Sequence, residues 1–200
     1  MRTVIFDLDG TLADTSADLI AAANAAFREI GAGDVLDPVA DALTAFHGGR
    51  AMLRLGFGRL GYGGEDDVDR AFPVLLQAYE DGIMRETRLY PGAVAAVERL
   101  RLAGFRTGIC TNKPEAPARA ILRHFQLDRF FKVIIGGDSL AERKPHPAPL
   151  RAAFAALGPA RPLFVGDSEV DAETAKAAGV PLALFTKGYR KTAADSLGAK

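Results

Sequence analysis

The chain has few of the residues that form covalent cross-links or zinc sites, since its 200 residues include one cysteine and three histidines. The single cysteine, Cys110, cannot form an intrachain disulfide, and a zinc site built from cysteines is excluded. No apolar stretch is long enough to span a bilayer, and the N-terminus runs directly into a predicted strand without a signal-peptide pattern. We therefore expect a cytoplasmic protein without a membrane partner, in which Cys110 is a small core residue.

The chain also has no excess of positive or of negative charge. Lysine and arginine number 25, aspartate and glutamate also number 25, and the formal net charge at pH 7 is therefore zero. This balance gives no indication of a nucleic-acid partner or of binding to an anionic membrane surface. Hydrophobic residues make up 48% of the chain, which is enough for one substantial core and a small accessory domain.

The stretch on which the interpretation of the chain depends lies near the N-terminus. Residues 3–6 (TVIF) form a non-alternating apolar run, typical of a central parallel strand covered on both faces. Asp7 stands at the carboxyl end of this strand, where open α/β sheets bind their ligands. Gly10 permits a sharp turn that can bring Asp9 to the same site, and Thr11 adds a hydroxyl. For Asp9 and Gly10 alone, an ordinary turn is the alternative.

From residue 90 onward, predicted strands alternate with predicted helices. This alternation predicts an α/β fold with a Rossmann-like, doubly wound and mostly parallel sheet. The predicted strands cover residues 107–110, 132–135, 163–165 and 182–185, and the predicted helices cover residues 93–103, 116–125, 149–157 and 172–178.

Between the first strand and this alternating region, the pattern is helical. Four amphipathic stretches are present, whereas a crossover between two parallel strands needs only one helix. We therefore expect an inserted α-helical cap at residues 16–86 and a core formed by residues 1–15 and 87–200. A capping-box-like sequence at residues 15–18 marks the start of the first helix. The four predicted helices cover about residues 16–30, 38–46, 52–60 and 65–83.

Polar residues collect after the strands of the predicted core. Thr111 and Asn112 follow one strand, and a hydroxyl with nearby backbone amides can bind a phosphate oxygen there. Lys144 lies in a proline-rich loop after the next strand and can supply the fixed positive charge that a phosphate among carboxylates requires. A turn threonine and a surface lysine are the alternative interpretations. We predict that Thr111 and Lys144 are catalytic residues and that Thr111, Asn112 and Lys144 bind the substrate.

Asp167 and Asp171 follow the predicted strand at residues 163–165. If a helix begins between them, both carboxylates can face the same crevice. Acidic residues at a helix N-terminus also have a simpler explanation, because they interact favourably with the helix dipole. Together with Asp7 they provide hard oxygen ligands suited to Mg²⁺. The predicted Mg²⁺ ligands are Asp7, Asp9, Asp167 and Asp171.

The sequence DLDGT at residues 7–11 resembles the first motif of the haloacid dehalogenase superfamily of phosphohydrolases. Thr111, Lys144 and the later acidic pair follow in the chain order of the superfamily's other motifs. The resemblance implies that Asp7 attacks phosphorus and becomes an aspartyl phosphate. It also implies that Asp9 protonates the leaving oxygen and then activates water.

Three further sequences make the core look most like the phosphoglycolate phosphatases and related small-phosphoester hydrolases, which carry a helical cap at this insertion point. They are TNK at residues 111–113, GDS at residues 166–168 and GY at residues 188–189. Asp9 argues against the haloacid dehalogenase and phosphonatase branches, which are not expected to keep an acid-base aspartate there. The resemblance therefore implies a Mg²⁺-dependent phosphatase for a small phosphorylated metabolite, with 2-phosphoglycolate favoured.

The predicted cap contains one candidate for substrate recognition, Arg50, in the turn at residues 46–50. Its guanidinium can pair bidentately with a substrate carboxylate, and a solvated arginine at the start of a helix is the alternative. Two other functions stay open: a phosphoryl-transferring mutase of the β-phosphoglucomutase type, and a non-catalytic binding protein on the same fold. We expect a monomer or a homodimer.

Overall fold

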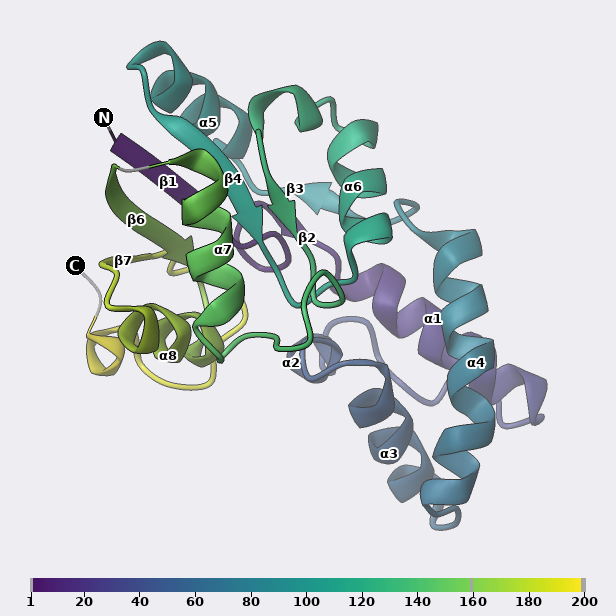
Figure 1. Cartoon of the computed structure of the whole chain (residues 1–200). Helices are drawn as coiled ribbons and strands as arrows, with labels where there is room; N and C mark the ends of the chain where they lie inside the picture. Colours follow the sequence, from purple (N-terminus) through teal and green to yellow (C-terminus); the bar gives the residue numbers. More distant parts are fainter. Residues whose placement is uncertain (1, 159, 199–200) are drawn as a thin grey trace. The chain divides into compact units, whose positions relative to one another are not determined.

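The computed structural model describes residues 2–158 and 160–198 of the chain. These residues form two compact units, and Figure 1 labels most of their helices and strands. Unit 1 combines the described parts of Met1–Asp14 and Leu89–Lys200, and unit 2 is Thr15–Arg88. The short paired strands β2 (Ala13–Asp14) and β3 (Arg88–Leu89) lie where the chain passes between the units. Within the described residues, no helix has the length and apolar character needed to cross a membrane.

Unit 1 is built on a five-stranded parallel sheet with the strand order β5-β4-β1-β6-β7. Strand β1 is central, since Val4 is in register with Thr107 of β4 on one side and with Leu163 of β6 on the other. The predicted doubly wound parallel sheet is confirmed. Its strands are β1 (Arg2–Phe6), β4 (Arg106–Cys110), β5 (Ile134–Ile135), β6 (Arg161–Gly166) and β7 (Leu182–Leu184).

Helices cover both faces of this sheet. The chain adds β4 and β5 on one side of β1 and then returns to add β6 and β7 on the other. Because crossover connections between parallel strands are right-handed, this reversal places α7 and α8 on the face opposite α5 and α6. In Figure 1, α7 crosses in front of the strands. The helices are α5 (Ala93–Leu102), α6 (Glu115–His124), α7 (Ala148–Leu157) and α8 (Glu169–Ala178), with 3-10 turns η1 (Asp128–Phe130) and η2 (Ala194–Leu197).

A buried apolar cluster joins the sheet to α7 and α8. Ile5 of β1, Phe164 of β6 and Leu150 of α7 are fully buried in it. The apolar run of β1 does not alternate because both faces of this strand are covered. Cys110, the last residue of β4, is also fully buried, as expected for a core residue.

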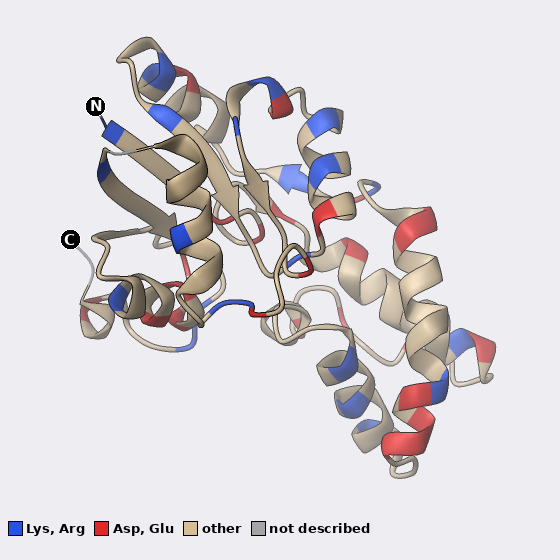
Figure 2. Ribbon diagram, viewed as in Figure 1, with Lys and Arg blue, Asp and Glu red and all other residues tan. Residues whose placement is uncertain are grey.

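The helices of unit 2 are α1 (Ser16–Glu29), α2 (Ala42–Ala45), α3 (Gly49–Leu60) and α4 (Glu65–Gly82). Helix α4 begins with Glu65, Asp66 and Asp67, which give its first turn the red colour in Figure 2. Negative charge at this end of a helix is favourable because it opposes the positive end of the helix dipole.

Helix α3 continues through Gly56, a residue that disfavours helix interiors. The ring of Phe27 from α1 lies against the backbone at this position. A Cβ atom on Gly56 would be only 2.1 Å from Cζ of Phe27. Phe27 also packs edge-on against Phe57, with ring centroids 5.3 Å apart. Glycine is therefore required at position 56 because α1 and α3 approach closely there.

The capping box predicted at residues 15–18 does not form. The side chain of Thr15 makes no cap hydrogen bond to α1. The carboxylate of Asp18, which is buried, binds the other end of unit 2 instead. It accepts hydrogen bonds from the backbone N–H groups of Met84, Glu86 and Thr87 and from the Thr87 hydroxyl. Satisfying these buried donors outweighs a local cap.

The helix predicted at residues 38–46 is reduced to the four residues of α2. A turn with side-chain hydrogen bonds precedes it. The carboxylate of Asp37 accepts hydrogen bonds from the backbone N–H groups of Val39 and Ala40, at 2.8 and 2.7 Å. These are the bonds that an N-cap side chain makes, and the turn that begins here passes into α2 at Ala42.

Candidate active site

Acidic side chains meet at the carboxyl edge of the unit 1 sheet. Asp7 follows β1 and Asp167 follows β6, and these neighbouring strands lie where the connections run in opposite directions. Open α/β sheets bind ligands at such a switch point. Asp171 comes from the first turn of α8. One carboxylate oxygen from each of Asp7, Asp167 and Asp171 lies within 4.8 Å of the other two.

Lys144, from the loop before α7, lies in this acidic cluster. Its Nζ is 2.9 Å from Oδ2 of Asp7 and 2.7 Å from Oδ1 of Asp171. The side chain of Lys144 is 2% exposed, so the interpretation as a surface lysine is wrong. The side-chain amide of Asn112 donates a hydrogen bond to the backbone carbonyl of Lys144 at 2.9 Å. In the structure, Asn112 therefore helps to hold the loop that carries Lys144.

The turn after β1 is fixed by hydrogen bonds and by close packing. The N–H of Leu8 donates to Oδ1 of Asp7 at 2.7 Å. Gly10 has a φ of +80°, and a Cβ atom there would lie 2.3 Å from the Tyr189 ring and 2.4 Å from a carboxylate oxygen of Asp167. Only glycine fits this position, both because of its backbone conformation and because of its neighbours.

Asp167 is 1% exposed and is held by donors from two separate loops. The hydroxyl of Thr11 donates to its Oδ1 at 2.7 Å, and the N–H of Tyr189 donates to its Oδ2 at 2.6 Å. Burial, together with the nearby carboxylate of Asp171, raises the pKa of Asp167 to about 6 although these hydrogen bonds oppose the shift. A bound cation would therefore favour its ionised form.

Asp171 is fully buried and forms a capping box with Ser168 at the start of α8. Its Oδ2 accepts hydrogen bonds from the hydroxyl and N–H of Ser168 and from the N–H of Asp167, at 2.8, 3.1 and 3.1 Å. Burial alone would raise the pKa of Asp171, but Lys144 and the Ser168 donors outweigh it and hold that pKa below its usual value. Asp171 thus both caps α8 and faces the cluster.

The charges of the cluster do not balance. Burial raises the pKa of Asp7 to about 8, because Lys144 offsets the burial and the Asp171 and Asp167 carboxylates only in part. Burial would lower the pKa of Lys144, but Asp171 and Asp7 outweigh it and raise that pKa, so Lys144 stays protonated. If all three carboxylates were ionised, they would exceed the one ammonium by two negative charges, and the raised pKa of Asp7 reflects this repulsion.

This donor set fits a hard divalent cation such as Mg²⁺, which would offset the excess charge and prefers carboxylate and water oxygens. Asp7 and Asp167 are the better suited ligands. Among the described residues, each oxygen of Asp167 accepts one hydrogen bond, whereas Oδ2 of Asp171 accepts three and its Oδ1 binds Lys144. Asp171 is therefore suited to orient the other groups.

Asp9 is not brought into the acidic cluster. In residues 2–158 and 160–198, the side chains that could share a metal ion are Asp7, Asp167 and Asp171. The carboxylate of Asp9 instead pairs with Lys113, whose Nζ lies 2.9 Å from its Oδ2. The role of Asp9 as a metal ligand stays a prediction that this side-chain arrangement does not support.

Thr111 directly follows β4 and is 3% exposed. Its N–H donates to the carbonyl of Ile135 at 3.0 Å, which continues the pairing of β4 with β5. Its hydroxyl accepts a hydrogen bond from the N–H of Lys113 at 3.2 Å. This geometry matches the turn-threonine interpretation, and phosphate binding by Thr111 stays a prediction.

The sequence interpretation gave no role to Lys113 or Tyr189. Tyr189 contributes its N–H to Asp167, and its hydroxyl hydrogen-bonds the carboxylate of Asp14. Lys113 pairs with Asp9. The available signal was position, because Lys113 directly follows Asn112 at a predicted strand end. The partner could not be read from the sequence, since Lys113 and Asp9 are 104 residues apart.

Arg50, the candidate for substrate recognition, lies at the start of α3 in unit 2. Its guanidinium forms an ion pair with Asp69 of α4 and stacks on the ring of Phe72, 4.6 Å from the ring centroid. The side chain of Arg50 is 43% exposed. Arg50 is therefore not simply solvated, and a substrate carboxylate would have to compete with Asp69 for it.

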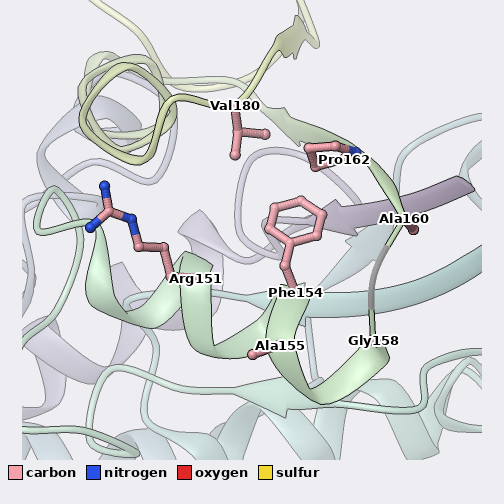
Figure 3. Close-up of a pocket in the computed structure, with 7 residues that line it drawn as sticks. All are labelled: Arg151, Phe154, Ala155, Gly158, Ala160, Pro162 and Val180. Atoms are coloured by element: carbon pink, nitrogen blue, oxygen red, sulfur yellow. The ribbon is translucent and has the colours of Figure 1, made fainter.

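Two cavities in the described part of unit 1 differ in their relation to the acidic cluster. One, of about 380 Å³, has a mainly apolar lining that includes Phe154, Pro162 and Val180 and contains none of the predicted site residues (Figure 3). The other, of about 640 Å³, is lined by the loop that carries Lys144 and includes His146. Only this second cavity involves a predicted site residue.

Comparison with known proteins identifies the class. A family model described as haloacid dehalogenase-like hydrolase matches residues 1–179. The chain therefore belongs to the haloacid dehalogenase-like hydrolases, and the resemblance inferred from its motifs is confirmed.

Several relatives carry the name phosphoglycolate phosphatase. One from Cereibacter sphaeroides is 46% identical over 193 residues, which cover 95% of this chain and 87% of the relative. One from Rhodospirillum rubrum is 40% identical over 208 residues, which cover 99% of this chain and 85% of the relative. The crystal structure of a predicted phosphoglycolate phosphatase from Haemophilus somnus has a TM-score of 0.87 and 27% identity, with 98% of this chain and 91% of that chain covered. The chain is thus an enzyme, a phosphoric monoester hydrolase similar to the phosphoglycolate phosphatases.

Proposed function

We propose that the chain is a Mg²⁺-dependent phosphatase that hydrolyses a small phosphomonoester through an aspartyl phosphate on Asp7. The observation that supports this most is the position of Asp7, which is paired with Lys144 at 2.9 Å and clustered with Asp167 and Asp171. A carboxylate nucleophile divides a difficult hydrolysis into two easier displacements. The ammonium of Lys144 can offset the charge of a phosphate among these carboxylates.

Each displacement uses Asp7 and Asp9. In the first, a carboxylate oxygen of Asp7 bonds to phosphorus, the bond from phosphorus to the ester oxygen breaks, and protonated Asp9 gives its proton to that oxygen. In the second, water attacks phosphorus, Asp9 takes a proton from the water, and the bond from phosphorus to Asp7 breaks. Inorganic phosphate leaves, and both residues return to their starting protonation states.

Asp7 and Asp167 would hold the Mg²⁺, and Asp171 would orient the neighbouring groups. When bound, the cation offsets negative charge on the phosphoryl oxygens. We propose Thr111 as a phosphate-binding residue because it directly follows β4, the strand next to β1. Asn112 contributes by fixing the backbone of Lys144, to which it donates a hydrogen bond.

We propose 2-phosphoglycolate as the substrate, because relatives with 40% and 46% identity are named phosphoglycolate phosphatase. We further propose that the helical segment 16–86 acts as a cap that contacts the part of the substrate that does not react. Arg50 is its candidate for binding a carboxylate. A cytoplasmic location and a monomeric or homodimeric state remain predictions.

A phosphate-release assay over small phosphorylated metabolites, with Mg²⁺ and with a chelator, tests this function. We expect release of inorganic phosphate from 2-phosphoglycolate that requires Mg²⁺. Absence of release from every ester would contradict the proposal. Isomerisation of a sugar phosphate that depends on a bisphosphate activator, with little net phosphate release, would instead support the mutase alternative.

A further inference from the structure

We propose that Lys113 is a positioning residue for Asp9, and this inference rests on the acid-base role that the proposed function gives to Asp9. The Nζ of Lys113 lies 2.9 Å from Oδ2 of Asp9. The Lys113 side chain is 3% exposed and the Asp9 side chain is 16% exposed, so the pair is largely shielded from water. An ion pair in this environment is geometrically defined, unlike the mobile pairs of an exposed surface.

The backbone of Lys113 is held from two sides. Its N–H donates to the hydroxyl of Thr111 at 3.2 Å, and its carbonyl accepts from the N–H of Gly137 at 2.8 Å. The loops after β4 and β5 touch here, because a Cβ atom on Gly137 would lie 2.2 Å from the carbonyl oxygen of Asn112. Lys113 is therefore presented to Asp9 by a fixed junction of two loops.

Two buried lysines pair with different acidic residues of the site. Lys144 pairs with Asp7 and Asp171, whereas Lys113 pairs with Asp9. The nucleophile and the acid-base residue thus have separate cationic partners. An acid-base group must lie within hydrogen-bond reach of the atom whose proton it transfers, and a displacement of ~1 Å can reduce a rate by ~100-fold. Holding the Asp9 carboxylate in place therefore has a direct consequence for the rate.

Three possible roles of Lys113, namely positioning Asp9, binding the phosphate and stabilising unit 1, predict different effects of its substitution. If Lys113 acts through Asp9, its loss matters where the leaving oxygen needs a proton and matters little where Asp9 is already disabled. If Lys113 bound the substrate's phosphate directly, its loss would affect every ester to the same degree. If Lys113 only stabilised unit 1, its loss would lower the melting temperature without selectivity among esters.

The test compares Lys113→Met, Asp9→Asn and the double variant on two esters. An alkyl phosphate such as 2-phosphoglycolate has a poor leaving group that requires protonation, whereas p-nitrophenyl phosphate releases a phenolate that does not. The quantity to compare is kcat/KM, because it reports the first displacement. Lys113→Arg, which keeps the cation, tests for rescue, and Lys132→Met, at an exposed lysine of unit 1, is the matched control.

We expect Lys113→Met to lower kcat/KM for the alkyl ester by roughly 10- to 100-fold and for the aryl ester by less than about threefold. In the Asp9→Asn background, the same substitution should add less than about threefold, as expected for residues that act as a unit. Lys113→Arg should recover part of the loss, and Lys132→Met should have no effect.

The positioning role would be overturned if Lys113→Met lowered kcat/KM equally for both esters or did not lower it at all. It would also be overturned if the losses from Lys113→Met and Asp9→Asn multiplied in the double variant. Failure of the proposed function looks different, because the wild-type protein would then hydrolyse neither ester. Denaturant unfolding of the same four proteins of the cycle gives a readout that is independent of turnover. Additive effects of the two substitutions on stability would show that the pair does not form, and would also overturn the inference.

Discussion

Asp7 is the residue on which the proposed chemistry depends. Its carboxylate is one of three in a buried cluster that contains one ammonium. We predict that Asp7→Asn reduces phosphatase turnover by more than about a thousandfold, because the amide cannot act as the nucleophile. The fold should persist, since the amide has nearly the same shape and removes one repulsive charge.

Steady-state turnover together with circular dichroism and thermal unfolding checks this prediction. Asp128→Asn, at an exposed carboxylate in η1, is the control and should keep full activity. Substantial turnover by carefully purified Asp7→Asn protein would rule out Asp7 as the nucleophile.

The two later aspartates should respond differently to substitution. Asp167→Ala removes a proposed ligand, so we predict that Mg²⁺ no longer activates the enzyme at concentrations that saturate the wild type. Asp171→Asn removes an orienting group and should raise the Mg²⁺ concentration for half-maximal activity by roughly 10- to 100-fold. Activity titrated with Mg²⁺ measures both effects. An unchanged titration curve for Asp167→Ala would place the metal elsewhere.

At the scale of the element, two glycines of α3 provide a matched pair. A Cβ atom on Gly56 would collide with the Phe27 ring, whereas nothing lies within 4 Å of a Cβ atom on Gly58. We predict that Gly56→Ala lowers the free energy of unfolding by about 1–3 kcal/mol through overpacking. Gly58→Ala should raise it by up to about 1 kcal/mol, because alanine favours helix interiors. Denaturant unfolding measures both, and equal effects would contradict the close contact of α1 and α3.

The ion pair of Asp41 and Arg59 links the segment before α2 to α3. Arg59 donates two hydrogen bonds of 2.6 Å to Asp41, whose side chain is 5% exposed. The Arg59 guanidinium holds the pKa of Asp41 below its usual value although burial opposes this. A lowered pKa in the folded state means that the stabilisation is present above the unfolded pKa of about 4 and is lost as the pH falls through the folded pKa.

We therefore predict that Asp41→Asn lowers the melting temperature by about 2–6 °C near pH 6. The difference from the wild type should begin to shrink as the pH falls below about 4, where the carboxyl of the unfolded chain becomes protonated, and should vanish below the folded pKa. Thermal unfolding followed across this pH range is the measurement. A difference that stays constant to the lowest pH would show that the effect is steric and not electrostatic.

At the scale of the whole molecule, the question is whether unit 2 contributes to substrate selection. We predict that Arg50→Ala lowers kcat/KM for 2-phosphoglycolate by roughly tenfold to a few hundredfold, if a desolvated pair with the substrate carboxylate is lost. Turnover of p-nitrophenyl phosphate, which has no carboxylate, should change little.

The ion pair between Arg50 and Asp69 supplies the control for this prediction. Asp69→Ala breaks the same pair from the other side while leaving Arg50 available. If Asp69→Ala lost as much activity toward 2-phosphoglycolate as Arg50→Ala, the pair itself would matter and not substrate binding. Equal losses of Arg50→Ala on both esters would also exclude a carboxylate-binding role.

The sequence by itself determined the strand-helix alternation and the placement of Asp7, Asp167 and Asp171. These are local properties, because a buried parallel strand leaves an apolar run and its carboxyl end is marked by the next polar residue. The last helix was predicted at residues 172–178, whereas α8 begins at Glu169, because Ser168 and Asp171 form a capping box one turn earlier. No knowledge of distant partners was needed for any of these predictions.

Only the tertiary structure decided which distant groups meet. Asp18 accepts hydrogen bonds from donors at the other end of unit 2 and not within the expected capping box. Lys113 pairs with Asp9, which is 104 residues away in the sequence. Lys144 proved to be buried between two carboxylates, and Gly56 proved to be required by the Phe27 ring. Such pairings depend on strand order and helix packing, which bring together groups that are far apart in the sequence. Burial then makes it costly to leave a charge or a hydrogen-bond donor unpaired.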